Sequence, residues 1–130
     1  MGVGHGLGAD GERAAVKFLE GRGYRIVASN YRTRLGEIDL IAEDGTTLVF
    51  IEVKARADDR FGGPAAAITR AKQARIARLA QQYMAARRLG ERACRFDAVL
   101  ISGEDPRLQR IELVTGAFEV FTSPGHRGPA

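Results

Sequence analysis

Residues 36–55 read GEIDLIAEDGTTLVFIEVKA, and this stretch decides how the chain folds. Asp44-Gly45 is a strong hairpin turn signal, so the apolar runs on either side of it are expected to pair as antiparallel strands. Each run contains a carboxylate, Asp39 in the first and Glu52 in the second. Because an unpaired buried charge costs several kcal/mol even after relaxation, these two acids are expected to share a partner.

The hairpin also predicts which side chains share a face of the sheet. If Asp44-Gly45 is the turn, Asp39 lies opposite Phe50 and Glu37 lies opposite Glu52. Side chains alternate along a strand, so Asp39, Glu52 and Lys54 are expected on one side. A slip of one residue would separate Asp39 from Glu52. The apolar positions expected on the other side are Ile38, Leu40, Val49, Ile51 and Val53.

Apolar periodicity and turn residues predict the element order α-β-β-β-α-β-β. The class is therefore α/β, with a mixed sheet of about five strands flanked by helices. The predicted helices span residues 8–22 and 65–89, and the predicted strands span residues 24–29, 36–43, 46–55, 95–101 and 110–114. Residues 119–121 are a candidate for a short last strand, and the domain is expected to cover residues 8–121 between a flexible N-terminus (1–7) and a flexible tail (122–130).

Length and composition narrow the class of protein. A chain of 130 residues predicts one domain with a real core. It contains no apolar run long enough to cross a membrane and no secretory signal. A single cysteine, Cys94, favours a reducing cytoplasm.

The net charge of the chain is a clue to the kind of molecule that it binds. The net charge is +4, and the basic residues are mostly arginine, which recognises phosphate through two parallel hydrogen bonds. A nucleic-acid partner is one interpretation of this balance. A genomic base composition that favours arginine and alanine is the other.

Two charged residues on the predicted helices point toward the sheet. Glu12 lies at the edge of the buried stripe of the first helix and can reach along the sheet, although a first-turn carboxylate is also favoured by the helix dipole. Lys72 shares the inward face of the second helix with Ile76, Leu79 and Tyr83. It can extend back to solvent or reach a phosphate held over the sheet, and both interpretations stay open.

The chemistry that fits these residues is that of a hard divalent cation, Mg²⁺ or Mn²⁺, which prefers oxygen ligands. Asp39 and Glu52 would supply carboxylate oxygens, the backbone carbonyl of Val53 a third ligand, and Glu12 a further one, directly or through water. Lys54 could orient the attacking water or stabilise charge at the phosphorus. The candidates for holding the phosphate backbone are Arg32, Arg34, Arg56, Lys72 and Arg75.

The chain resembles the PD-(D/E)xK nuclease superfamily, and more closely the YraN-like family of predicted endonucleases, which is related to archaeal Holliday junction resolvases. The stretches that carry the resemblance are Gly11-Glu12-Arg13-Ala14-Ala15, Asn30-Tyr31-Arg32, Gly36-Glu37-Ile38-Asp39-Leu40-Ile41, Phe50-Ile51-Glu52-Val53-Lys54-Ala55-Arg56, Lys72-Gln73-Ala74-Arg75 and Arg95-Phe96-Asp97. It implies a restriction-endonuclease-like core. It also implies Asp39 and Glu52 as metal ligands, Lys54 as the catalytic lysine, and Glu12 as the helix-one glutamate of the resolvase branch.

The chain departs from the superfamily pattern in two places. Ile38 stands where some members have a proline before the aspartate. The Gln-xxx-Tyr motif of RecB-like exonucleases is absent, because Leu79 stands four residues before Tyr83. The second departure argues against an exonuclease of that branch.

The function expected from the sequence is metal-dependent endonucleolytic hydrolysis of DNA, with branched or junction DNA among the candidate substrates. A non-catalytic DNA-binding accessory protein and a nuclease acting on RNA are the alternatives. A twofold homodimer would supply two sites for symmetric cutting. Two further acids are not among the predicted ligands. Glu37 is interpreted as an auxiliary carboxylate or a plain surface residue. Asp97 is interpreted as the structural partner of Arg95, with a supporting role at the site as the alternative.

Overall fold

The computed structural model describes residues 8–55, 68–103, 107 and 109–118. The predicted terminal segments, the candidate strand at 119–121 and Arg56 lie outside these residues. The elements are α1 (Gly8–Gly21), β1 (Arg25–Thr33), β2 (Gly36–Asp44), β3 (Thr47–Ala55), α2 (Arg70–Ala86), β4 (Cys94–Ser102) and β5 (Arg110–Val114). The predicted α/β class and the order α-β-β-β-α-β-β are confirmed.

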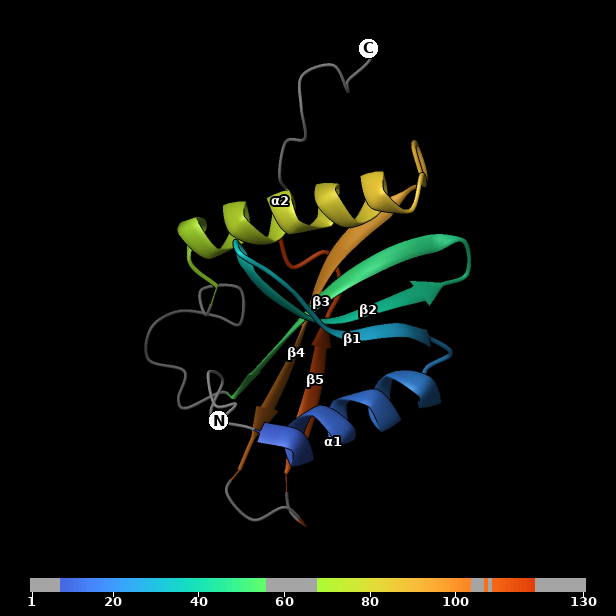
Figure 1. The fold of residues 1–130 in the computed structure, drawn as a ribbon. Helices are drawn as coiled ribbons and strands as arrows, with labels where there is room; N and C mark the ends of the chain where they lie inside the picture. The colour runs from blue at the N-terminus through green and yellow to red at the C-terminus, as the bar shows by residue number, and fades with distance from the viewer. Residues whose placement is uncertain (1–7, 56–67, 104–106, 108, 119–130) are drawn as a thin grey trace.

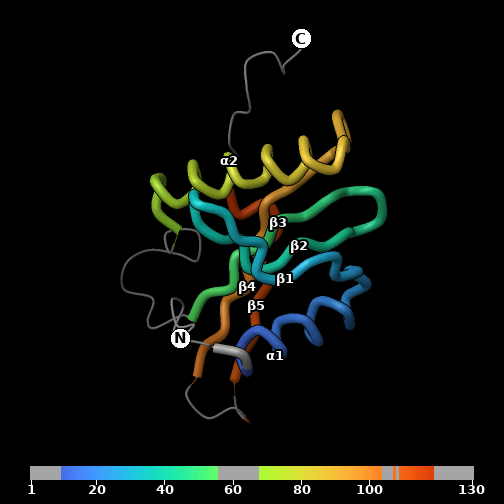
Figure 2. The backbone as a smooth tube through the Cα atoms, in the orientation of Figure 1, coloured from blue at the N-terminus to red at the C-terminus, as the bar shows by residue number. Residues whose placement is uncertain are grey.

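The strands form one mixed sheet in the order β1-β2-β3-β4-β5. Only β3 and β4 run parallel among these pairs, and α2 connects them, as a crossover between parallel strands requires. Figures 1 and 2 show α1 and α2 on opposite sides of the sheet. The architecture therefore has three layers, with the sheet in the middle.

Each face of the sheet carries its own hydrophobic core. The α1 side buries Ala15, Leu19, Tyr24, Leu40, Ala42, Val49, Ile51, Val53, Val99 and Ile101. The α2 side buries Ile38, Ile41, Leu48, Phe50, Ile68, Ile76, Leu79, Ala80, Tyr83, Phe96 and Ala98. Because both faces are covered, β2, β3 and β4 are apolar in nearly consecutive positions.

The predicted register of the hairpin is wrong, because the turn lies one residue further along the chain. Asp44 pairs with Thr47, so the two-residue turn is Gly45-Thr46 and not Asp44-Gly45. Gly45 has φ +63, which fits a type II′ turn, where glycine stands at the first central position. Phe50 consequently lies opposite Ile41 and not Asp39, and the predicted pairing of Glu37 with Glu52 is also wrong.

Side-chain alternation breaks in β1 and β2 at the same level of the sheet. Ile38 packs on the α2 side, whereas Leu40, two residues later, packs on the α1 side. In β1, Asn30 has φ 52, a left-handed conformation that Asn adopts more readily than most residues. The prediction that Ile38 shares a face with Leu40 is therefore wrong. The predicted common face of Asp39 and Glu52 rested on the same unbroken alternation.

Some element boundaries also differ from the predictions, and two of them have a clear local cause. β1 continues to Thr33, because β2 offers it partners as far as Gly36. α2 begins at Arg70, where the Thr69 hydroxyl accepts a hydrogen bond from the backbone N–H of Lys72 over 3.1 Å. A threonine N-cap of this kind satisfies one of the free donors of the first helical turn.

Within the described ranges, neither helix combines the length and the apolar composition needed to cross a membrane.

Candidate metal centre

Three carboxylates from α1 and β2 converge on one point. Glu12, Glu37 and Asp39 each offer an oxygen, and these oxygens lie within 4.8 Å of one another. Glu12 and Glu37 are half-buried, whereas Asp39 is 1% exposed. Two oxygens on opposite sides of one Mg²⁺ stand about 4.2 Å apart, so this spacing is close to that of a shared cation. The donor set and its geometry fit a hard divalent metal.

Asp39 is fixed by the neighbouring strand. The β2–β3 pairing extends from the hairpin turn to Leu40 and Ile51. Beyond this pair, the N–H of Val53, two residues after Ile51, donates to Oδ2 of Asp39 over 2.8 Å. Burial, followed by the negative charge of Glu52, raises the pKa of Asp39 to about 8. The two acids are therefore close enough to interact electrostatically, and a cation between them would relieve that repulsion.

Glu12 is oriented by a residue that sequence reasoning did not select as a site residue. Asn30 donates from Nδ2 to Oε1 of Glu12 over 3.2 Å. The positive φ of Asn30 turns this side chain toward α1 at the break in β1. The sequence carried a signal, because Asn is depleted in strands and enriched in left-handed conformations.

Glu37 belongs to the cluster, although it was predicted only as an auxiliary carboxylate or a surface residue. Arg32, directly opposite in β1, forms an ion pair with Glu37 at 3.2 Å. Arg32 was predicted to hold a phosphate, and in the structure its guanidinium contacts an acid of the metal centre. It lies at the rim of the cluster, with its side chain 68% exposed.

Glu52 lies outside this group of three acids and faces α2. Lys72 Nζ lies 2.5 Å from Oε2 of Glu52, and the two side chains are 27% and 2% exposed. The contact is an ion pair between a buried carboxylate and a partly exposed ammonium. Lys72 therefore lies over the sheet as an ion-pair partner of Glu52, and its predicted contact with a phosphate stays a prediction. The shared ion of Asp39 and Glu52 stays a prediction.

Lys54 stands two residues after Glu52 and is half-buried on β3, opposite Leu100 of β4. Its role as the catalytic lysine stays a prediction, as does the role of the Val53 carbonyl as a ligand. The group of Val53 that contacts the site is its backbone N–H. Alternation along β3 puts Lys54 on the same side of that strand as Glu52.

Arg34 and Arg75, two of the predicted phosphate-binding arginines, belong to the β1–β2 turn and to α2. Arg34 is exposed in the β1–β2 turn, and Figures 1 and 2 show this turn next to α2. Arg75 passes over Gly36: a Cβ at Gly36 would meet Cδ of Arg75 at 2.9 Å. The missing side chain at Gly36 therefore makes room for the stem of Arg75.

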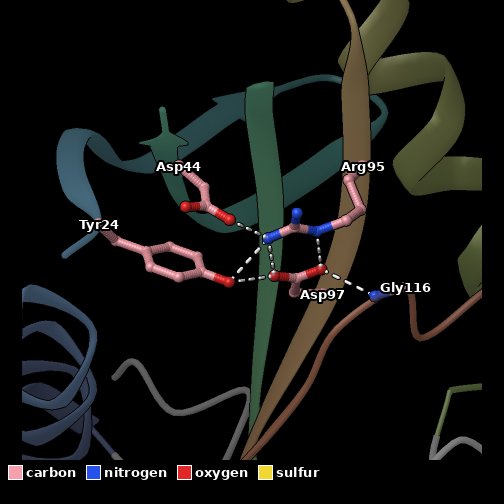
Figure 3. A network of polar contacts seen from close by, with 5 residues as sticks. All are labelled: Tyr24, Asp44, Arg95, Asp97 and Gly116. Carbon is pink, nitrogen blue, oxygen red and sulfur yellow. Dashed lines mark hydrogen bonds and ion pairs between the residues drawn. The ribbon is translucent and has the colours of Figure 1, made fainter. Parts of the chain in front are cut away.

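Asp97 is buried in a separate network, shown in Figure 3. Arg95 donates from Nε to Oδ1 of Asp97 over 2.9 Å, which confirms the predicted structural pairing. Tyr24 donates to Oδ2 of Asp97 over 2.8 Å, and Gly116 donates its N–H to Oδ1 over 2.9 Å. Arg95 also reaches Asp44 at the far end of β2. The network joins the residue before β1 to β2, β4 and the segment after β5, and it contains none of the three clustered carboxylates.

Comparisons with known proteins agree on one family. Residues 11–101 match the uncharacterised protein family UPF0102, a segment that contains every acid of the cluster together with Glu52, Lys54 and Lys72. A UPF0102 protein of Symbiobacterium thermophilum is 54% identical over 115 residues, which cover 86% of this chain and 95% of the relative. A UPF0102 protein of Nitrosomonas europaea is 49% identical over 112 residues, covering 86% of this chain and 92% of the relative.

Proposed function

The chain belongs to the uncharacterised protein family UPF0102, and from its carboxylate centre we propose that it is a metal-dependent endonuclease that hydrolyses DNA. The observation that carries the proposal is the convergence of Glu12, Glu37 and Asp39 within 4.8 Å. Acids held this close repel one another, and a hard cation is the partner that offsets the repulsion.

The residues of this chain have distinct roles in the proposal. Asp39, Glu37 and Glu12 would hold Mg²⁺ or Mn²⁺, with Glu52 beside Asp39 as a further acid. The metal, when bound, lowers the pKa of a water and polarises a phosphoryl oxygen. Lys54, on the Glu52 side of β3, would orient that water and stabilise charge on the phosphorus.

Cations around the cluster support a polyanionic substrate. Arg32 contacts Glu37 at its rim, and Arg34 and Arg75 lie beside the β1–β2 turn. Phosphate contacts of this kind position a nucleic acid without reading its sequence. They support a nucleic acid in general, and we propose that it is DNA, including branched and junction forms, cleaved by a restriction-endonuclease-like core of the PD-(D/E)xK type. The single cysteine is consistent with a cytoplasmic enzyme.

The test is cleavage of linear, flapped and four-way DNA, with matched RNA in parallel, in the presence of Mg²⁺ or Mn²⁺. We expect cutting by the wild type and a loss of at least about 100-fold in Asp39→Ala, Glu52→Ala and Lys54→Ala. Lys17→Met and Glu20→Gln, on the exposed side of α1, are the controls and should retain activity.

Three results would change the assignment. Cutting that survives all three substitutions would show a contaminating nuclease and refute the proposal. Metal-independent binding with no cutting of any DNA would favour an accessory protein. Preferential cutting of the matched RNA would move the substrate from DNA to RNA.

A further inference from the structure

The contact between Lys72 and Glu52 puts a positive charge where the proposed metal would need a negative one. Lys72 Nζ lies 2.5 Å from Oε2 of a glutamate that is 2% exposed. The charge of Lys72 also reaches Asp39 and is among the causes that lower its pKa, against the larger effects of burial and Glu52. The ammonium group of Lys72 on α2 thus already offsets part of the negative charge of the carboxylates.

We propose that Lys72 is an internal counter-cation that competes with the metal for Glu52 and is released from it when a phosphate of the nucleic acid arrives. The inference rests on the proposed function and adds a positioning role for α2. Without nucleic acid, Lys72 neutralises Glu52 and weakens metal binding. With nucleic acid bound, the ammonium moves to the phosphate, and Glu52 becomes available to the metal.

The surroundings of Lys72 allow this movement of the side chain while its backbone stays in place. The Thr69 hydroxyl accepts from the N–H of Lys72 and fixes the first turn of α2. One turn further, Ile76 is buried against the sheet and anchors the same face of the helix. The Lys72 side chain is 27% exposed, and its four-carbon stem is flexible, so the ammonium can turn outward.

The form of the contact also favours exchange. An ion pair joins Oε2 of Glu52 to the ammonium of Lys72, and both groups carry a full charge. A contact made by charge can be replaced by another cation. A doubly charged metal at Glu52 is the replacement that this centre would favour once Lys72 has a phosphate to bind.

The proposal predicts that metal and nucleic acid strengthen each other's binding. If the phosphate draws Lys72 away from Glu52, the nucleic acid raises the metal affinity, and by linkage the metal raises the nucleic-acid affinity by the same factor. Couplings between sites are commonly about 5- to 150-fold. Removing the ammonium should raise the metal affinity of the free protein and abolish the coupling.

The experiment measures Mn²⁺ binding to the full chain by electron paramagnetic resonance, first without nucleic acid. We expect Lys72→Met to bind Mn²⁺ about 5- to 150-fold more tightly than the wild type. Lys72→Arg, which keeps the charge, should stay close to the wild type. The control is Arg78→Met, which removes a cation from the exposed face of the same helix and should change nothing.

The second measurement repeats the titration with the DNA that the wild type cleaves, made with phosphorothioate linkages to slow hydrolysis. The Mn²⁺ affinity of the wild type should rise on addition of this DNA, and that of Lys72→Met should not. Thermal melts accompany each variant, and Lys72→Gln replaces Lys72→Met if the latter fails to fold.

The outcomes separate this inference from the function on which it rests. If wild type and Lys72→Met bind Mn²⁺ with equal affinity, or if the variant binds more weakly, Lys72 does not compete with the metal. If the wild type binds Mn²⁺ more tightly with DNA and Lys72→Met does so equally, the exchange onto phosphate is wrong. If neither protein binds Mn²⁺ at all, the proposed function itself fails.

Discussion

Val53 donates its backbone N–H to Oδ2 of Asp39 over 2.8 Å, just beyond the last backbone pair between β2 and β3, which is Leu40 with Ile51. The Asp39 carboxylate thus accepts a hydrogen bond from the backbone of β3 at the point where the backbone pairing of the hairpin ends. The strand fixes Asp39, while burial and the charge of Glu52 raise its pKa. Asp39 is therefore fixed in an environment that favours the protonated, neutral form of its carboxyl group.

The first prediction concerns the stability of the metal-free protein. The pKa of Asp39 is raised from 3.8 to about 8, so the folded state holds a proton that the unfolded state releases. The free energy of unfolding should accordingly fall as the pH rises from about 4 to about 8. Asp39→Asn, whose amide oxygen can still accept from Val53, should flatten this fall and stabilise the protein at pH 8. Urea denaturation at several pH values measures both effects.

Glu20→Gln is the control for that series, because it removes an exposed carboxylate of α1. Its pH dependence should match that of the wild type. A fall in stability between pH 4 and 8 that persists unchanged in Asp39→Asn would show that another group causes it.

The second prediction concerns metal uptake. Since the Asp39 carboxyl holds a proton up to about pH 8, a bound cation must displace it. The affinity for Mn²⁺ should rise with pH up to about 8 and then level off. Calorimetry in buffers of different ionisation enthalpy should detect net proton release at pH 7. An affinity independent of pH from 6 to 8 would contradict the assigned protonation of Asp39.

The sequence was sufficient to predict the framework of the fold. The order of helices and strands follows from apolar periodicity and turn residues, which are local properties. Asp39 could be singled out because a carboxylate in an apolar run demands a partner. The error in the hairpin register did not change which side chains share a face. Moving the turn from Asp44-Gly45 to Gly45-Thr46 shifts the pairing without exchanging the faces of β3.

The composition of the acid cluster could not be predicted in the same way. Unbroken alternation puts Glu37 and Asp39 on one face, but the alternation breaks where Asn30 adopts a positive φ and where Ile38 and Leu40 pack on opposite sides. Whether a strand takes up such a break depends on the packing of both helices, which no local pattern encodes. The contact between Lys72 and Glu52 likewise depends on how α2 lies across β3.

The third prediction tests the orientation of Glu12 by Asn30. Asn30→Gly keeps a residue that accepts φ 52 but removes the amide that donates to Glu12. The Mn²⁺ affinity should fall about 3- to 10-fold, because one hydrogen bond contributes about 1 kcal/mol to the orientation of Glu12. Asn30→Ala should lose the same affinity and, in addition, about 1 kcal/mol of stability through strain at positive φ. Equal melting temperatures for the two variants would contradict the strain argument.

The fourth prediction concerns the packing of the Arg75 side chain against Gly36. A Cβ at Gly36 would lie 2.9 Å from Cδ of Arg75, and Gly36 has φ +139, which side chains rarely accept. Gly36→Ala should destabilise the protein by about 1–3 kcal/mol through backbone strain and displace Arg75. Arg75→Ala relieves the clash, so the double variant should recover the clash component but not the strain. Chemical denaturation of the single and double variants measures this recovery.

The last prediction uses the network around Asp97 to separate stability from the metal centre. Tyr24 donates to Asp97 and accepts from Arg95 Nη2 over 2.7 Å, so Tyr24→Phe should cost about 1–2 kcal/mol of stability. Asp97→Asn should cost more, because the bonds from Arg95 lose their charge assistance. Neither change should alter the Mn²⁺ affinity of the folded protein, since the network meets β2 at Asp44 and not at Asp39. A tenfold change in that affinity would show that the two polar groups are coupled through the sheet.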